Sequence, residues 1–225
     1  MSRIIYGIFV AGGSGTRMGS QTPKQFLELG GKPILQRSIE KFLEAIPEIK
    51  IITVLPKEHF GTWKELCVRY ALDCPQIIVE GGFTRFHSVK NALAKVPDGS
   101  IVFIHDGVRP MISVELIREM NTKMDDGARA LVPAVPVVDT LKSKDPDGDD
   151  PDRSRIVAVQ TPQVFLSEDI KEAYKLGFDT AFTDDASVAK RKKIPLTFVD
   201  GERFNIKITT PEDLELAELL LSRGK

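Results

Sequence analysis

A glycine-rich loop followed by two basic residues is the segment of this sequence best suited to chemistry. An apolar run, residues 4–10, leads into the loop, and Arg17 and Lys24 follow it. The permissive backbone positions of the loop are Ala11, Gly12, Gly13 and Gly15. Glycines let backbone N–H groups approach an anion closely, and arginine and lysine supply positive charge for phosphate oxygens. Together these parts predict a polyphosphate site, with a nucleotide as the candidate ligand.

Two common nucleotide-binding motifs do not match this loop. The dinucleotide fingerprint G-x-G-x-x-G requires a glycine where Met18 stands. The P-loop requires Gly-Lys-Ser/Thr, whereas this loop closes with Gly15-Thr16-Arg17. Taken alone, the loop is therefore also compatible with an ordinary glycine-rich turn between a strand and a helix.

Two further groups of residues follow predicted strands and could contact a ligand. Gly82, Arg85 and Ser88 open a helix, where glycines and backbone N–H groups suit close approach, although a plain turn explains them about equally well. Asp106 and Arg109 stand at the end of a strongly apolar strand. The Asp106 carboxylate could hold Mg²⁺ or a ribose hydroxyl, and Arg109 could clamp a second phosphate. The alternative is a structural Asp–Arg pair.

The remaining candidates lie in the second half of the chain, and the sequence offers no evident side-chain nucleophile. The candidates are Thr140, Arg153, Thr161 and Lys207. The three histidines have no metal-ligand spacing, and Ser14 has no evident triad partner. An acceptor that is itself a phosphate is already anionic near neutral pH. Catalysis would then consist of positioning and charge neutralisation, as in phosphoryl-type transfers.

The elements that must position these residues follow an alternating pattern. Strands are predicted at residues 4–10, 50–55, 76–79, 101–105, 128–133 and 196–199. Helices are predicted at residues 34–45, 58–70, 86–95, 114–123 and 167–176, and a last helix begins after Thr210 with Pro211. This alternation predicts an α/β fold, a Rossmann-like, mostly parallel sheet flanked by helices. Ligands of such sheets bind at the carboxyl ends of the strands, where the glycine loop and Asp106 fall.

One segment breaks the alternation. Two β-rich runs within residues 135–160 flank the polar turn Pro146-Asp147-Gly148-Asp149, which predicts a long, protruding β-hairpin. A hairpin on its own is marginally stable in water, so a second subunit is a natural packing partner. We therefore interpret residues 1–225 as one domain with an arm at 136–160 that forms a homodimer.

Composition limits the classes of function. The 225 residues carry a net charge of −1, so no overall basic field predicts nucleic-acid binding. No apolar run approaches the roughly 20 residues that span a bilayer, and the start of the sequence shows no signal-peptide pattern. Cys67 and Cys74 have no metal or redox spacing and are interpreted as reduced thiols. We expect a cytoplasmic protein that binds neither nucleic acid nor membrane.

The groups of residues together resemble the 2-C-methyl-D-erythritol 4-phosphate cytidylyltransferase family. The resemblance covers nearly the whole chain, in order and at compatible spacing. It is carried by the glycine loop with Pro-Lys-Gln, then Gly-Gly-x-x-Arg-x-x-Ser, His-Asp-x-x-Arg-Pro, Asp-Thr-Leu-Lys, Thr-Pro-Gln, Thr-Asp-Asp-Ala-Ser and Asn-Ile-Lys-Ile-Thr. The glycine loop alone is shared with other nucleotidyltransferases, so the combination carries the argument. It implies an enzyme that joins CTP to a polyol phosphate with Mg²⁺.

The resemblance also implies residue roles. Ala11, Gly12, Gly13 and Gly15 would wrap the CTP triphosphate, and Arg17 and Lys24 would stabilise charge on the α-phosphate and the pyrophosphate. Gly82, Arg85 and Ser88 would lie at the nucleotide, and Asp106 would lie near the ribose and the Mg²⁺. The polyol phosphate would be held by Arg109, Thr140, Arg153, Thr161 and Lys207. Thr140 and Arg153 would reach in from the partner's arm.

Alternatives remain open at this point. Phe83 stands where an acidic residue is common in the family, and Gly107 replaces a more usual alanine. Ribitol-5-phosphate cytidylyltransferases share the loop and the Asn-Ile-Lys-Ile-Thr-Thr-Pro run, although Asp139-Thr-Leu-Lys142 and Asp184-Asp-Ala-Ser187 favour the methylerythritol enzyme. A non-catalytic nucleotide-binding sensor is the alternative from another class. It predicts the loss of a charged position, yet all the expected charges are present.

Overall fold

The structure is a computed structural model that describes residues 3–13, 22–145 and 147–224. The strands are β1 (Ile5–Val10), β2 (Glu28–Leu29), β3 (Lys32–Pro33), β4 (Lys50–Leu55), β5 (Gln76–Glu80), β6 (Ile101–Asp106), β7 (Ala130–Pro136), β8 (Val157–Val159), β9 (Gln163–Leu166) and β10 (Thr197–Asp200). The α-helices are α1 (Ile34–Ala45), α2 (Phe60–Arg69), α3 (Arg85–Leu93), α4 (Val114–Asp125), α5 (Ser167–Ala173), α6 (Asp185–Arg191) and α7 (Pro211–Ser222). Short 3₁₀ turns occupy Lys24–Phe26, Lys57–His59 and Arg153–Arg155.

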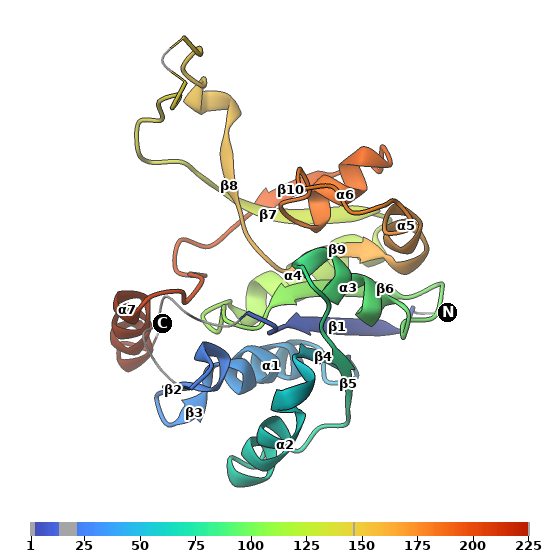
Figure 1. Cartoon of the computed structure of the whole chain (residues 1–225), viewed down its shortest axis with the longest axis vertical. Coiled ribbons are helices and arrows are strands. Elements are labelled where there is room, and N and C mark those ends of the chain that lie inside the picture. Colours follow the sequence, from blue (N-terminus) through green and yellow to red (C-terminus); the bar gives the residue numbers. More distant parts are fainter. Residues whose placement is uncertain (1–2, 14–21, 146, 225) are drawn as a thin grey trace.

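The main sheet has the order β10-β7-β9-β6-β1-β4-β5, with β8 paired to β7 (Figure 1). Strands β6, β1, β4 and β5 run parallel, as do β10 and β7. The predicted α/β fold with a mostly parallel sheet is thus confirmed. Strand β9 was not predicted, and it runs antiparallel between β6 and β7. Its four residues are too few to show a periodic pattern.

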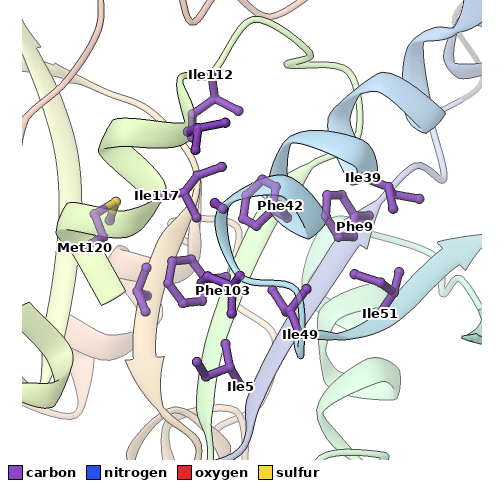
Figure 2. Packing of buried hydrophobic residues seen from close by; sticks show 14 of the residues in the cluster. Ile5, Phe9, Ile39, Phe42, Ile49, Ile51, Phe103, Ile112, Ile117 and Met120 are labelled. Carbon is purple, nitrogen blue, oxygen red and sulfur yellow. The ribbon is translucent and has the colours of Figure 1, made fainter. Parts of the chain in front are cut away.

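Helices cover both faces of this sheet because its central strands carry apolar side chains on both sides. On one face, β1 and β6 pack against α1, α2 and α4. Figure 2 shows this core, in which Phe42 of α1 packs edge-on against Phe9 of β1, with ring centroids 5.0 Å apart. On the other face, Tyr6 and Ile8 of β1 pack with α3, α5 and α6. Strand β1 is therefore fixed from both sides, and so is the loop that follows it.

Capping side chains define where the site-bearing helices begin. Thr84 precedes α3 and accepts a hydrogen bond from the His87 backbone N–H, and Thr210 forms a capping box with Asp213 before α7. Pro211 occupies the first turn of α7, as the sequence predicts. Among the described residues, no helix has the length and apolar character needed to cross a bilayer.

The arm differs from the predicted long hairpin. Strand pairing stops after Ala134–Pro136 against Val157–Val159, and residues 137–156 form turns and a 3₁₀ segment where they are described. Figure 1 shows this segment projecting from the sheet. Prolines at 136 and 151 cannot donate ladder hydrogen bonds, and an isolated two-stranded ribbon is marginal in water. A protruding β-hairpin is therefore confirmed, with strand pairing confined to its base.

Candidate active site

A cavity of about 300 Å³ lies at the carboxyl ends of β1 and β6, where an open α/β sheet places its ligands. It brings together many of the residues that the sequence predicts: Ala11, Gly12, Gly13, Lys24, Arg85, Ser88, Asp106 and Lys207. A larger cavity of about 520 Å³ lies between α1, the start of α4 and the end of α7, and none of the predicted site residues lines it. The smaller cavity is therefore the candidate site.

The described start of the glycine loop forms one wall of this cavity. The Ala11 backbone N–H donates to the Val54 carbonyl at 3.0 Å, and the Ala11 carbonyl accepts from Gln25 Nε2 at 2.8 Å. Among the described residues, a Cβ added to Gly12 or Gly13 would meet no atom closer than 3.9 Å, and both positions line the cavity. These glycines keep space open for a ligand against the backbone. Gly15 and Arg17 lie outside the described residues.

The turn before α3 and the first residues of that helix also contribute to the cavity lining. The Gly82 backbone N–H donates to Ser88 Oγ at 3.0 Å. A Cβ at Gly82 would lie 2.4 Å from the Cβ of His87, so this position has room only for glycine. Phe83 follows, lines the cavity and is fully exposed. Gly82 and Ser88 thus lie together in the structure, and Ser88 lines the cavity.

The Asp106 carboxylate is the electrostatic centre of the site. Lys207 Nζ lies 3.0 Å from Asp106 Oδ2, and Arg109 Nε lies 3.5 Å from the same oxygen. Arg85 Nε lies 3.5 Å from Oδ1. Burial acts to raise the pKa of Asp106, but Arg85, Lys207 and Arg109 outweigh burial and hold that pKa well below its usual range. Asp106 is therefore a carboxylate at neutral pH, surrounded by an excess of positive charge.

A buried hydrogen-bond chain fixes the backbone of Asp106. The Thr161 hydroxyl accepts from the Asp106 backbone N–H at 3.0 Å and lies 3.2 Å from His105 Nδ1. His105 Nε2 lies 3.1 Å from the Arg109 carbonyl. Burial lowers the pKa of His105 to about 4, so its imidazole is neutral at physiological pH. Thr161 is buried, at 5% exposed, and its hydroxyl holds the Asp106 backbone N–H in place.

Arg109 and Lys207 are held beside Asp106 by the segment before α7. Arg109 Nη1 donates to the Asn205 carbonyl at 2.7 Å, and Asn205 Nδ2 donates to the Thr161 carbonyl at 2.9 Å. Asn205 is fully buried. Asn205 was not among the predicted site residues, although it opens the Asn-Ile-Lys-Ile-Thr run that carries Lys207. Asn205 thus links two candidate substrate-binding residues, Arg109 through its backbone carbonyl and Thr161 through its side chain.

The arm residues lie apart from this cavity. Arg153 Nη1 donates to the Val138 carbonyl at 2.9 Å, within the arm. Arg153 lines a separate surface depression with Pro136 and Val157, and Thr140 is exposed. Within one chain, the structure therefore does not bring Thr140 or Arg153 to Asp106.

Sequence reasoning also missed two residues behind Arg85. The Arg85 guanidinium donates to both carboxylate oxygens of Asp185, at 2.9 and 2.6 Å, and Tyr174 Oη donates to Asp185 Oδ1 at 2.6 Å. Asp185 is fully buried. Burial disfavours the charge on Arg85, but Asp185 and Asp106 outweigh burial and raise its pKa above the usual value. The available signal was the Thr-Asp-Asp-Ala-Ser motif, which carried no assigned role.

The described residues contain no cluster of three or more His, Cys, Asp or Glu side chains that could hold a metal ion by themselves. Asp106 is the acidic side chain among those that line the cavity. Any divalent cation here would take one protein carboxylate and depend on the ligand for its other anionic oxygens.

Comparisons with known proteins agree on one family. A sequence model described as 2-C-methyl-D-erythritol 4-phosphate cytidylyltransferase matches residues 5–223. A protein of that name from Bacteroides fragilis is 46% identical over 215 residues, which cover 95% of this chain and 98% of the relative. The namesake from Nocardia farcinica is 40% identical over 219 residues, covering 95% and 92%.

Solved structures give the same result. The 4-diphosphocytidyl-2C-methyl-D-erythritol synthase of Anaerococcus prevotii superposes with a TM-score of 0.82 at 31% identity, covering 98% of this chain and 97% of that one. The 2-C-methyl-D-erythritol 4-phosphate cytidylyltransferase of Francisella tularensis superposes with a TM-score of 0.80 at 29% identity, covering 96% and 99%. The similarity therefore extends over the whole length of these proteins.

Proposed function

Because this chain belongs to the 2-C-methyl-D-erythritol 4-phosphate cytidylyltransferase family, we propose how its own residues perform that family's reaction. The chain is a nucleotidyltransferase that joins CTP and 2-C-methyl-D-erythritol 4-phosphate to give CDP-methylerythritol and pyrophosphate, in isoprenoid precursor biosynthesis. The observation that carries the residue assignments is the cavity lined by the glycine loop, at which Asp106 contacts Lys207, Arg109 and Arg85.

The reaction requires no nucleophile from the protein. A phosphate oxygen of the polyol substrate forms a bond to the α-phosphorus of CTP, and the bond from that phosphorus to the pyrophosphate oxygen breaks. The attacking group is anionic near neutral pH, so the protein must bring two anions together and stabilise the charge that develops. A site of backbone N–H groups, lysines and arginines suits this task.

The triphosphate lies along the glycine loop in this proposal. Gly12 and Gly13 leave the cavity open against the backbone, and Lys24 lines the same wall. Lys24, together with Arg17 and Gly15 from the undescribed part of the loop, would neutralise the α-phosphate and the departing pyrophosphate. Gly82 and Ser88, at the start of α3, would receive the cytosine, with backbone groups contacting the base.

The polyol phosphate lies beside Lys207 and Arg109. Both cations contact Asp106 Oδ2 in the structure, so each can pair with a phosphate that enters next to this carboxylate. Thr161 would contribute indirectly, because its hydroxyl accepts a hydrogen bond from the Asp106 backbone N–H and so fixes the position of Asp106. This assignment places the attacking phosphate next to the α-phosphate of CTP, both at the Asp106 carboxylate.

The site fits Mg²⁺ that arrives with CTP. Mg²⁺ is usually held by one or two carboxylates, substrate phosphates and water, and Asp106 is a nearly buried carboxylate at the cavity wall. Asp106 would be its protein ligand, and the bound ion would neutralise charge on the triphosphate oxygens. The low pKa of Asp106 keeps the carboxylate available as a ligand at every physiological pH.

We further propose a homodimer in which the arm, residues 136–160, completes the partner's site. Three valines of the arm and Phe198 of the neighbouring edge strand expose apolar side chains: Val138, Val157, Val159 and Phe198. Burial of these side chains against a second copy would remove apolar surface from water. It would also give Thr140 and Arg153 a function that one chain alone does not provide.

The function is tested by pyrophosphate release from CTP and Mg²⁺, with 2-C-methyl-D-erythritol 4-phosphate and ribitol 5-phosphate offered in parallel. We expect rapid release with the methylerythritol substrate and release at least about tenfold slower with ribitol 5-phosphate. Faster release with ribitol 5-phosphate would contradict the substrate assignment but leave the CTP site as described. CTP binding without turnover of either polyol phosphate would favour the sensor alternative.

A further inference from the structure

We propose that Asp185 and Tyr174 are positioning residues that orient Arg85 and thereby keep the Asp106 carboxylate free for the substrates. This inference rests on the proposed function of the Asp106 cavity. It concerns two residues that lie behind the cavity wall, and neither lines the cavity in which the reaction takes place.

The first step is the geometry of Arg85. Arg85 is the first residue of α3, and its guanidinium contacts both Asp185 and Asp106. Both terminal nitrogens are used by Asp185, at 2.9 and 2.6 Å, so only Nε is directed at Asp106, at 3.5 Å. Paired carboxylate–guanidinium contacts of this kind are directional as well as strong. Asp185 therefore decides which part of the guanidinium faces the active site.

The second step is that Asp185 itself is rigidly held. It is fully buried, and Tyr174 Oη donates to its Oδ1 at 2.6 Å. The Tyr174 ring stacks on Phe86, with ring centroids 4.7 Å apart. The start of α6 is also tied to the sheet, because Gln163 of β9 accepts from the Ala186 backbone N–H at 2.7 Å. Since β9 pairs with β6, the position of Asp185 is fixed relative to the strand that ends in Asp106.

The third step is electrostatic. Without Asp185, the largely buried Arg85 guanidinium would keep only its 3.5 Å contact to Asp106, and burial of a poorly paired charge is costly. The nearest other carboxylate is Asp106, which Arg85 already contacts through Nε. Freed from Asp185, the guanidinium can turn both terminal nitrogens onto Asp106. That pairing would occupy the oxygens that the proposed mechanism leaves to the ribose and Mg²⁺.

The test compares five single variants and one double variant of the full-length protein in the pyrophosphate-release assay. Asp185→Asn removes the charge but keeps the shape, and we expect kcat to fall by about tenfold to a hundredfold, as is usual for residues that orient a site. The KM for CTP should rise as well, because a guanidinium redirected onto Asp106 would compete with the ribose and Mg²⁺ of the nucleotide for its oxygens. Asp185→Glu restores the charge and should recover most of the lost kcat.

Asp179→Asn is the matched control. It also neutralises an aspartate that pairs with an arginine near α6, since Asp179 contacts Arg191 at 2.8 Å, but this pair is exposed. We expect its kcat to equal that of the wild type. Tyr174→Phe removes one hydrogen bond and keeps the ring on Phe86. It should lower kcat by about twofold to fivefold, in line with the loss of about one hydrogen bond. If Asp185→Asn does not fold, Tyr174→Phe tests whether the residues behind Arg85 affect kcat.

A double variant shows whether Asp185 acts through Arg85. If it does, Arg85→Ala combined with Asp185→Asn should be no slower than Arg85→Ala alone, whereas independent effects would multiply. The inference is overturned if Asp185→Asn, or Tyr174→Phe where the former is insoluble, lowers the melting temperature but leaves kcat unchanged. Multiplying effects in the double variant would also overturn it. Wild-type turnover tests the proposed function separately, because each variant is compared with the wild type as a ratio.

Discussion

The Asp106 cluster and the arm both carry candidate substrate-binding cations, but they differ in what holds those cations in place. Asp106 is 7% exposed, and Lys207, Arg109 and Arg85 surround it in fixed positions. In the arm, Arg153 is exposed and is bonded to the Val138 carbonyl nearby in the same segment. The cluster is complete within one chain, whereas the arm displays residues whose function requires a second chain.

This difference has a physical consequence for the two kinds of variant. Charges in the cluster act at low local dielectric and are preorganised, so each contributes strongly to the binding of anions. Charges on the arm are solvated in the isolated chain and become ordered only when the proposed dimer forms. Substitutions around Asp106 should therefore lower the catalytic rate directly. Substitutions in the arm should lower it by removing a contact that forms only in the dimer.

The largest effect is expected from removing a cation at the triphosphate wall. Lys24→Ala and Arg17→Ala should each lower kcat by about 10² to 10³ or more, because a preorganised charge donor is worth that much in the transition state. The pyrophosphate-release assay measures this, with circular dichroism to confirm the fold. Lys190→Ala, at an exposed position, is the matched control and should be unaffected. Activity within about tenfold of wild type would remove Lys24 or Arg17 from its assigned role.

The next effect concerns stability in acid and depends on His105. The pKa of His105 is lowered to about 4 in the folded state. Between about pH 6.5 and pH 4 the imidazole is therefore protonated in the unfolded chain and neutral in the folded chain. Stability should therefore fall as pH falls through this window, by roughly 2–3 kcal/mol for this group alone at pH 4.5. Urea unfolding at pH 7 and pH 4.5 measures the change.

The matched comparison for this prediction is His105→Gln, which cannot take up the proton. Subtracting its pH dependence from that of the wild type isolates the imidazole from all other titrating groups. The Asp106 carboxylate does not interfere, because its folded pKa is depressed and its contribution is lost only below the ordinary aspartate range. Identical pH dependence in the two proteins would show that His105 is protonated without cost in the folded state.

The sequence could predict the sheet and much of the site because both follow from local patterns. Residues 34–45 and 50–55 were predicted with the bounds that α1 and β4 have, since apolar periodicity and strand propensity are local properties. Asp106 and Gly12 could be expected at one edge because loops after parallel strands meet there. The short elements β9 and α6 were missed, having only four and seven residues.

The supporting residues could not be predicted for a different reason. Arg85 and Asp185 are 100 positions apart in the sequence, and their contact depends on how β9 inserts between β6 and β7. The side chains of Asn205 and Gln25 donate to the backbone carbonyls of Thr161 and Ala11. Every residue has a backbone carbonyl, so the sequence does not indicate which one accepts such a bond. Whether Thr140 and Arg153 complete a partner's site stays a prediction, because it concerns a contact outside one chain.

An arm variant sharpens the comparison. Arg153→Ala should lower kcat/KM for the polyol phosphate by about tenfold to a hundredfold, corresponding to the loss of one charge-assisted contact, and should leave the KM for CTP unchanged. Val157→Asp should instead shift the protein from dimer to monomer, because it places a charge among the exposed apolar side chains of the arm. Steady-state kinetics and sedimentation measure the two effects.

A mixture of two inactive variants then tests whether sites are shared between chains. Arg153→Ala and Lys24→Ala proteins, each slow alone, should regain activity when exchanged into mixed dimers, because one of the two sites then has both cations. Equal activity of mixed and parental dimers would place Arg153 and Lys24 of the same chain in one site, or Arg153 in none.

The smallest effect is expected from an ion pair at the exposed end of the arm. Lys142 and Asp150 form a salt bridge there, with 73% and 49% of their side chains exposed. Pairs of this kind gain little in water and are screened by salt, so Asp150→Asn should change the free energy of unfolding by less than about 1 kcal/mol. Activity should stay within about twofold of wild type. Thermal unfolding and the pyrophosphate assay check both values. A loss comparable to that of Asp185→Asn would mean that the arm is as preorganised in one chain as the Asp106 cluster, and the contrast between the two regions would fail.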